Sequence, residues 1–235
     1  MNYNRLLHAT RRHPSAVLLV VQLAGLVLYP FLEATRSAPF ILGAFGIMVL
    51  IITTGMVRRT PGLSWVSACF ALPATVLLLL QAFMGMHWLL PWSAALEAVF
   101  YFYAAGSLIA YMMQDSNATT DELFAASATF TLLAWAFAHV FVVLQALQPG
   151  SFGGAVNPGD PRTWTELMYL SFALLSSTGI GDVIPLTPRA RAFASLEMFV
   201  GVMYLAAVVS RLIGMTLSPR PVQPSTPAPT DRSEP

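Results

Sequence analysis

The chain has 235 residues, of which 56% are hydrophobic and only 10% are charged, and its mean hydropathy is +0.66. Soluble domains carry about 25% charged residues, so this composition excludes a protein whose whole surface faces water. The formal net charge of +1 excludes a strongly basic nucleic-acid-binding surface, and the single cysteine, Cys69, excludes an intrachain disulfide. We therefore expect the lipid bilayer, and no nucleic acid, as a partner.

Six apolar runs are each close to the length of about 20 residues that crosses a bilayer as a helix. In chain order they are Ala16–Glu33, Phe40–Val57, Ser64–Phe83, Leu89–Met112, Leu123–Leu147 and Ala192–Met215. A seventh run, Trp164–Ser176, has 13 residues and suits a re-entrant helix better than a span. The sequence predicts an all-α membrane protein with six transmembrane helices and a re-entrant pore helix between the fifth and the sixth.

The predicted organisation begins with a cytoplasmic segment, residues 1–15, and a four-helix transmembrane domain, residues 16–113. The fourth run carries no arginine and a single acid, Glu97. A voltage sensor needs several arginines there, since each charge crossing the field contributes about 2.3 kcal/mol per 100 mV. The sequence therefore excludes a voltage sensor of this type. An alternative for residues 1–33 is a cleaved signal peptide, whose removal would leave five crossings.

The arginines predict the orientation of the six crossings by the positive-inside tendency. One side of the membrane carries Arg5, Arg11, Arg12, Arg58, Arg59, Arg211 and Arg220. The other side carries Arg36, Arg162, Arg189 and Arg191. The linker "QDSNATTDELF" also falls on the first side but carries no arginine, so it is a mild exception to the positive-inside tendency. We expect a multi-pass protein of the cell membrane, with both termini in the cytoplasm.

Two ionisable side chains inside predicted spans are candidate functional groups, because charged groups in a membrane are costly and often functional. Glu97 and His139 both lie in predicted spans. His139 is either a neutral, hydrogen-bonded side chain between helices or a group that senses protons near neutral pH. Glu97 either pairs with His139 or stays protonated. The sequence carries no motif for a metal, a nucleotide or a catalytic nucleophile, so we expect neither an enzyme nor a cofactor.

The segment "LSSTGIGDVIP", Leu175–Pro185, places glycines and hydroxyl-bearing residues between apolar runs. Thr163 and Glu166 predict a capping box at the start of the short helix before it. Gly179 and Gly181 permit an extended strand that alternates between right- and left-handed backbone, so that its carbonyls point one way. Four copies around an axis would form rings of oxygen atoms that replace the hydration shell of a monovalent cation. The alternative is a glycine-rich bend that holds no ion.

The residues "STGIGD", Ser177–Asp182, with about 50 residues around them, "ELMYLSFALLSSTGIGDVIPLTPRARAFASLEMFVGVMYLAAVVSRLIGM", resemble the pore of the potassium-channel superfamily, in particular bacterial six-span channels. The resemblance implies a homotetramer conducting potassium, with a pore domain over residues 121–217 and a disordered proline-rich tail over 218–235. It implies an ion-coordinating filter of Ser177, Thr178, Gly179, Ile180 and Gly181. It also implies filter support from Asp182, Tyr169 and Glu197, with Glu197 hydrogen-bonded to the pore helix or loop, and an inner-helix hinge at Gly201.

Three filter residues depart from the family pattern. Ser177 stands where threonine is usual, Thr178 adds a hydroxyl that needs a partner, and Ile180 replaces an aromatic ring. Each change loosens the support around the carbonyl rings, so a weakly selective sodium/potassium channel is an alternative to a potassium channel. A carrier or a membrane-embedded enzyme is the remaining alternative. A carrier would be expected to show internal repeats or paired broken helices, and the sequence shows one broken segment.

Overall fold

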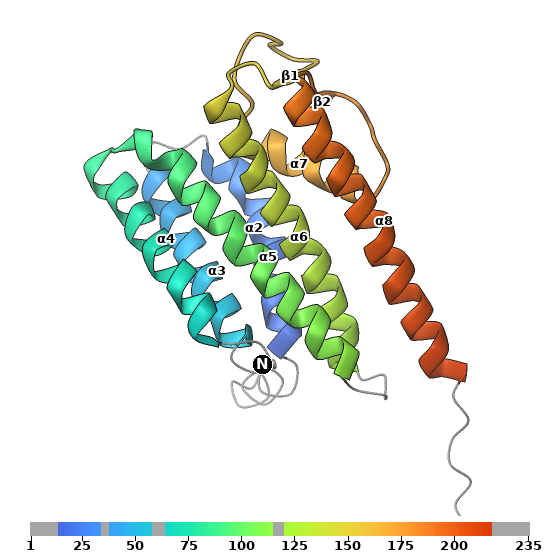
Figure 1. Cartoon of the computed structure of the whole chain (residues 1–235). Helices are drawn as coiled ribbons and strands as arrows, with labels where there is room; N and C mark the ends of the chain where they lie inside the picture. The colour runs from blue at the N-terminus through green and yellow to red at the C-terminus, as the bar shows by residue number, and fades with distance from the viewer. Residues whose placement is uncertain (1–13, 34–37, 58–63, 115–119, 218–235) are drawn as a thin grey trace, which may run out of the picture.

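The computed structural model describes residues 14–33, 38–57, 64–114 and 120–217 (Figure 1). Their helices are α2 Pro14–Glu33, α3 Ala38–Val57, α4 Ser64–Met84, α5 Leu90–Gln114, α6 Thr120–Leu147, α7 Trp164–Leu175 and α8 Pro188–Leu217. A 3₁₀ turn, η1, covers His87–Leu89, and two short strands are β1 Phe152–Gly154 and β2 Val183–Pro185. Residues 1–13 and the tail 218–235 lie outside the described residues, so the expectations for both ends stay predictions.

Five helices in the described part of the chain are long and apolar enough to cross a membrane. These spans are Pro14–Leu32, Trp65–Met84, Leu90–Met113, Asp121–Leu147 and Pro188–Arg211. In α3 the described apolar part, Ala44–Val57, is shorter. The all-α membrane fold is therefore confirmed, whereas the count of six crossings stays a prediction.

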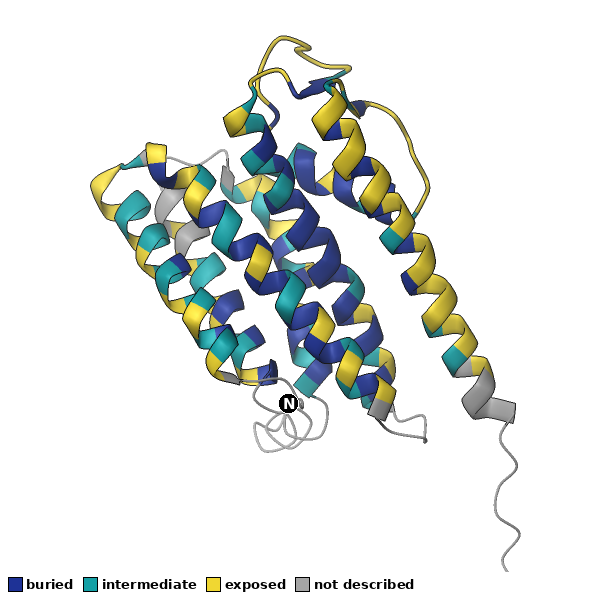
Figure 2. Ribbon diagram, in the orientation of Figure 1, coloured by how far each residue is buried: buried dark blue, intermediate teal, exposed yellow. Residues whose placement is uncertain are grey.

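Helices α2 and α5 pack on α6, and α3 and α4 pack in turn on α2 and α5 (Figure 1). The buried side chains concentrate along α5 and α6 (Figure 2). Large members of this core are Phe100, Tyr101 and Leu132, all fully buried. At the start of α2, Ser15 hydrogen-bonds the carboxylate of Asp121 through its backbone N–H and its hydroxyl. Helix α2 is thus an integral part of the bundle.

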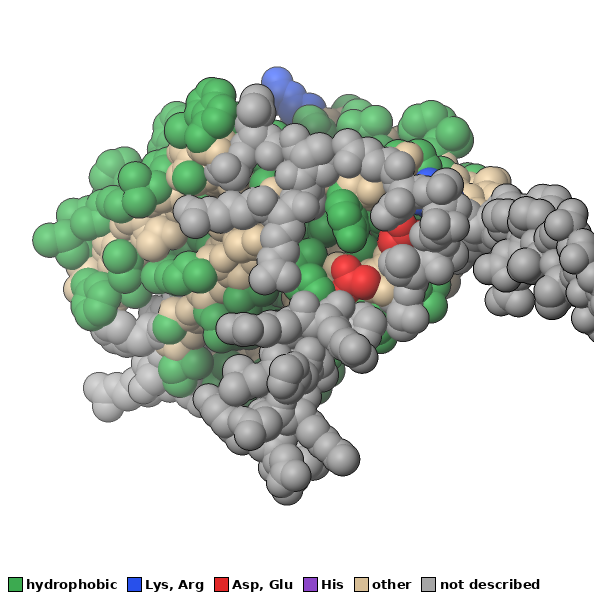
Figure 3. All heavy atoms as spheres, turned by 90° about the horizontal axis from the view of Figure 1, so that it is seen from below, with side chains coloured by type: hydrophobic (Ala, Val, Ile, Leu, Met, Phe, Trp, Pro, Cys, Tyr) green, Lys and Arg blue, Asp and Glu red, His purple; other side chains and the backbone are tan. Residues whose placement is uncertain are grey.

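Apolar side chains cover the rim of the bundle (Figure 3), as a lipid-facing surface requires. Helix α8 extends away from the bundle (Figure 1) and leaves much of its length exposed (Figure 2). Two polar interactions link its C-terminal half to α6. The Tyr204 hydroxyl donates to the carbonyl of Ala126, and Arg211 pairs with Glu122 at 3.6 Å.

A two-stranded antiparallel sheet, which the sequence did not predict, lies at the end of the bundle where α6 ends and α8 begins. Phe152 in β1 stands opposite Pro185 in β2. The backbone N–H of Ala155 extends this pairing by donating to the carbonyl of Asp182 at 2.7 Å. The sheet thus joins the segment after α6 to the segment after α7, and α7 lies between α6 and α8 beneath it.

Candidate functional site

Helix α7 begins with the capping box predicted from the sequence. The backbone N–H of Glu166 donates to the Thr163 hydroxyl at 3.3 Å, and the Glu166 carboxylate accepts from the backbone N–H of Thr163 at 2.8 Å. Two otherwise unpaired N–H groups of the first turn are satisfied in this way. The start of the helix is therefore fixed in register.

Arg162, directly before this cap, holds the loop between α6 and α7 in place, a role that the sequence did not predict. Its side chain is only 2% exposed and pairs with Glu166 at 3.0 Å. The guanidinium also donates to the carbonyls of Val156, Asn157 and Asp160. The side-chain amide of Gln145 bonds both the N–H and the C=O of the Arg162 backbone, at 2.8 and 2.9 Å. Most of these partners are backbone atoms, which no residue pattern reveals.

The segment after α7 has an alternating backbone. Ser177, Gly179 and Gly181 have φ values of 59°, 56° and 85°, whereas Thr178 and Ile180 keep negative φ. The left-handed conformation predicted for the two glycines is confirmed, and a serine shares it. Such alternation turns successive carbonyls of an extended strand toward the same side. A side chain at Gly179 would meet no atom within 4 Å, so its backbone conformation, and not packing, requires glycine there.

Hydrogen bonds anchor the inner end of this segment to α7. The N–H groups of Thr178 and Gly179 both donate to the carbonyl of Ala173, at 3.0 and 3.2 Å. The extra hydroxyl of Thr178 also donates to Ala173 and lies 3.0 Å from the Ser176 hydroxyl. Among the described residues, nothing donates a hydrogen bond to the carbonyls of residues 177–181. All five residues are exposed in the single chain, which leaves their oxygens available.

Asp182 and Tyr169, predicted as filter support, contact each other. The Tyr169 hydroxyl donates to the Asp182 carboxylate, which also accepts from the backbone N–H of Val183 at 2.9 Å. Ile180 is 66% exposed in the single chain. The outer end of the segment therefore depends on the Tyr169–Asp182 contact and on the sheet.

Glu197 of α8 is fully buried and hydrogen-bonds the Ser171 hydroxyl of α7. The same hydroxyl lies 2.8 Å from the carbonyl of Ala134 in α6. Ser171 has one hydrogen to donate, so both contacts are satisfied together when Glu197 donates to Ser171 and Ser171 donates to Ala134. This junction joins the short helix to both of its long neighbours. Its contribution to filter support stays a prediction.

Gly201 lies at the crossing of α8 and the end of α7, in a continuous helix. A Cβ atom there would lie 2.0 Å from the carbonyl oxygen of Leu175 and 2.7 Å from its carbonyl carbon. Close contact with the Leu175 backbone thus explains why glycine occupies this position, and the sequence did not predict that contact. The hinge stays a prediction.

Glu97 lies in α5 and His139 in α6, and neither side chain contacts the segment after α7. The sequence left their pairing open, and the structure joins them at 3.0 Å. Among the described residues, no group of three or more His, Cys, Asp or Glu side chains could hold a metal ion.

Comparison with known proteins gives one match. No curated protein and no solved structure matches the chain. A sequence-family model described as "Ion channel" matches residues 98–217, which are 120 of the 235 residues. The match includes α6, α7, the alternating segment and α8. The chain belongs to this ion channel family and, with it, to the potassium-channel superfamily.

Proposed function

We propose that four copies of the chain form a passive potassium channel in the cell membrane, with residues 177–181 as its filter. One observation carries the proposal: the backbone of this segment alternates in φ, and its carbonyls accept no hydrogen bond from the described residues. Rings of such oxygens can replace the water around a dehydrated potassium ion. The oxygens of Ser177, Thr178, Gly179 and Ile180, with the Ser177 hydroxyl, would coordinate the ion.

The exposure of the same segment supports assembly. Unpaired carbonyls facing lipid would cost several kcal/mol each, so they need an aqueous path or other subunits. Apolar residues of α8, among them Leu196, Phe199 and Val202, are also exposed in the single chain. Packing α8 of each copy around a common axis would cover part of this surface and bring four filters together. The termini would lie in the cytoplasm, and bending or splaying of α8, with a hinge at Gly201, would gate conduction.

A weakly selective sodium/potassium channel is the second candidate, because Ile180 is largely exposed where relatives carry an aromatic ring. The Tyr169–Asp182 contact favours potassium, since it holds the outer end of the filter. A carrier or embedded enzyme receives less support. Among the described residues, ionisable groups inside the spans meet as two separate pairs, Glu97–His139 and Arg211–Glu122, and the family is one of ion channels.

Ion flux in liposomes tests the proposal. We expect barium-sensitive potassium flux and, in mixed salts, a reversal potential close to that of potassium; one midway between the potassium and sodium values would favour the second candidate. Gly179→Ala should abolish flux, because an L side chain is strained at φ 56°. Gly159→Ala is the control, since that glycine has ordinary φ and open space around it. Unchanged flux in Gly179→Ala would refute the filter.

A further inference from the structure

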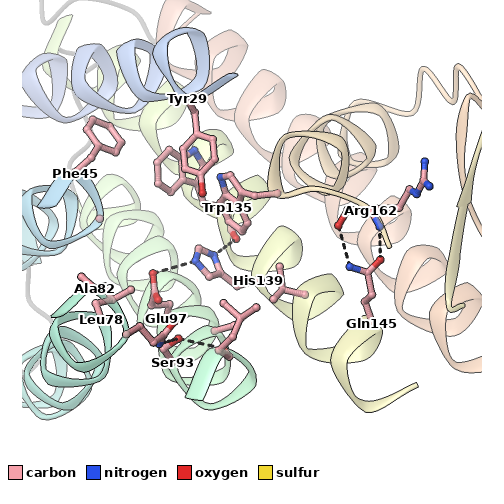
Figure 4. Close-up of a pocket in the computed structure, with 16 residues that line it drawn as sticks. Tyr29, Phe45, Leu78, Ala82, Ser93, Glu97, Trp135, His139, Gln145 and Arg162 are labelled. Carbon is pink, nitrogen blue, oxygen red and sulfur yellow. Dashed lines mark hydrogen bonds and ion pairs between the residues drawn. The ribbon is translucent and has the colours of Figure 1, made fainter. Parts of the chain in front are cut away.

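A cavity of about 350 Å³ lies between the four-helix domain and α6 (Figure 4), and residues 177–181 are not part of its lining. Helices α2 to α6 and the start of α7 all contribute to its lining. Four aromatic side chains form much of the wall: Tyr29, Phe45, Trp135 and Trp164. The lining residues from the ends of α4 and α6, Gln81 and Gln145, place it toward the end of the bundle that carries the sheet. The volume is that of a small-molecule site.

The Glu97–His139 pair lies in the wall of this cavity, and its hydrogen bonds fix the number of protons it holds. Nδ1 of His139 lies 2.7 Å from the carbonyl oxygen of Trp135, which can only accept, so Nδ1 carries a hydrogen. Nε2 lies 3.0 Å from Oε2 of Glu97. This second contact needs one proton, either on Nε2 or on the carboxyl group. The closed pair is therefore neutral as a whole.

Loss of that proton would change the character of the cavity. Glu97 would be an unpaired carboxylate and Nε2 of His139 a bare acceptor, and both would repel each other. A cation that donates hydrogen bonds would relieve this repulsion. Among the described lining residues Glu97 is the only carboxylate, so the cavity would then carry a single negative charge beside aromatic faces.

Other titratable groups near the pair do not supply a competing charge. Tyr29 lines the cavity from α2, and the ring of Tyr101 in α5 lies 5.3 Å from that of His139. Arg162 reaches the cavity beside Gln145, but its guanidinium points away from His139 (Figure 4) and is held by Glu166 and loop carbonyls. The described lining residues of α3 and α4 carry no titratable side chain.

We propose that this cavity binds a small primary ammonium ion with an apolar body, in exchange for the proton shared by Glu97 and His139. The ammonium group donates hydrogen bonds to the Glu97 carboxylate and to Nε2 of His139, and the apolar body contacts the aromatic wall. Carboxylates and aromatic faces are the common recognition elements for ammonium groups. One positive charge enters and one proton leaves, so the charge of the site stays balanced.

The proposed site borders the start of α7, because the ring of Trp164, the first residue of that helix, lies 4.4 Å from the ring of His139. An occupant therefore touches the helix whose other end leads into the segment of residues 177–181. Binding itself does not depend on conduction, so its test is separate from the test of the channel.

Calorimetry on the purified full-length protein, with benzylammonium as the probe, tests the proposal. Benzyl alcohol is the neutral control of nearly equal shape. We expect benzylammonium to bind at least tenfold more tightly than the alcohol and to release one proton per ion bound. Its dissociation constant should then fall about tenfold per pH unit while the pair holds its proton. Equal affinity of the two probes, or binding without proton release, would overturn the proposal.

Glu97→Gln separates this site from binding near the filter. A glutamine amide can donate to Nε2 of His139, so the hydrogen bond is kept while the carboxylate is lost. We expect affinity for benzylammonium to fall at least tenfold, with affinity for benzyl alcohol unchanged. Asp160→Asn, which removes an exposed acid of the loop between α6 and α7, is the matched control and should bind as the unaltered chain does. Equal benzylammonium affinity in Glu97→Gln and the unaltered chain would refute the site; if Glu97→Gln does not fold, the two-probe comparison above decides.

Discussion

At the scale of single residues, Gly201 is a helix position where the backbone of a neighbouring helix leaves no room for a side chain. In an open helix, alanine is favoured over glycine by about 1 kcal/mol. At Gly201 the new methyl group would lie 2.0 Å from a carbonyl oxygen, so the end of α7 or the path of α8 must shift. We expect Gly201→Ala to lower the thermal unfolding midpoint and to reduce ion flux.

Gly106→Ala in α5 is the matched control, because a side chain there meets nothing within 4 Å. This variant should keep full flux and unfold at the same or a slightly higher temperature. Equal stability and flux in Gly201→Ala and Gly106→Ala would contradict the close contact between α8 and α7.

Tyr169→Phe tests the proposed support of the proposed filter, residues 177–181. The substitution removes only the hydroxyl that donates to Asp182, in a side chain that is 36% exposed. We expect little change in the unfolding temperature and a lower potassium-to-sodium permeability ratio, measured from reversal potentials. Tyr204→Phe removes a hydroxyl that bonds the carbonyl of Ala126 in α6 and not Asp182, and should leave the ratio unchanged. A normal ratio in Tyr169→Phe would mean that the hydroxyl does not support selectivity.

At the scale of elements, the sequence predicted helices well where apolar runs are long. The exception in α8 is informative, because the helix begins at Pro188, before the predicted Ala192. Proline suits the first turn, and the Thr187 hydroxyl accepts from the N–H of Ala190 at 3.3 Å, so a start signal was present outside the apolar run. The strands β1 and β2 have three residues each, and α7 separates them in the sequence. Strands this short and this far apart show no hairpin pattern in the sequence.

The loop between α6 and α7 gives a prediction for Arg162. Lysine keeps the charge but cannot reach several carbonyls at once with a planar group. We expect Arg162→Lys to destabilise the protein by about 1–3 kcal/mol, the cost of leaving buried partners unpaired, and to speed proteolysis within residues 152–160. Arg189→Lys, at an exposed position near the start of α8, is the control. Equal proteolysis rates in both variants would show that the loop does not depend on Arg162.

At the scale of the whole molecule, the motif "STGIGD" predicted the position of the alternating segment, because two glycines one residue apart favour this backbone conformation locally. The Glu97–His139 pair joins residues 42 positions apart, and the contact of Gly201 with Leu175 joins two helices. Such contacts depend on how helices cross, which hydropathy does not encode. The long apolar helices and the candidate filter could therefore be predicted from the sequence, whereas the cavity and the contacts between helices could be found only in the structure.

Residues 177–181 and apolar residues of α8 are exposed in the single chain, as the proposed assembly requires. The central claim is that the carbonyls of residues 177–181 from four copies meet on one axis. A density map of the purified protein in potassium chloride tests it most directly. We predict fourfold symmetry, with ion density on the axis between the rings of Ser177 to Ile180 oxygens. A map in which these residues face lipid, or lie away from a shared axis, would contradict the account.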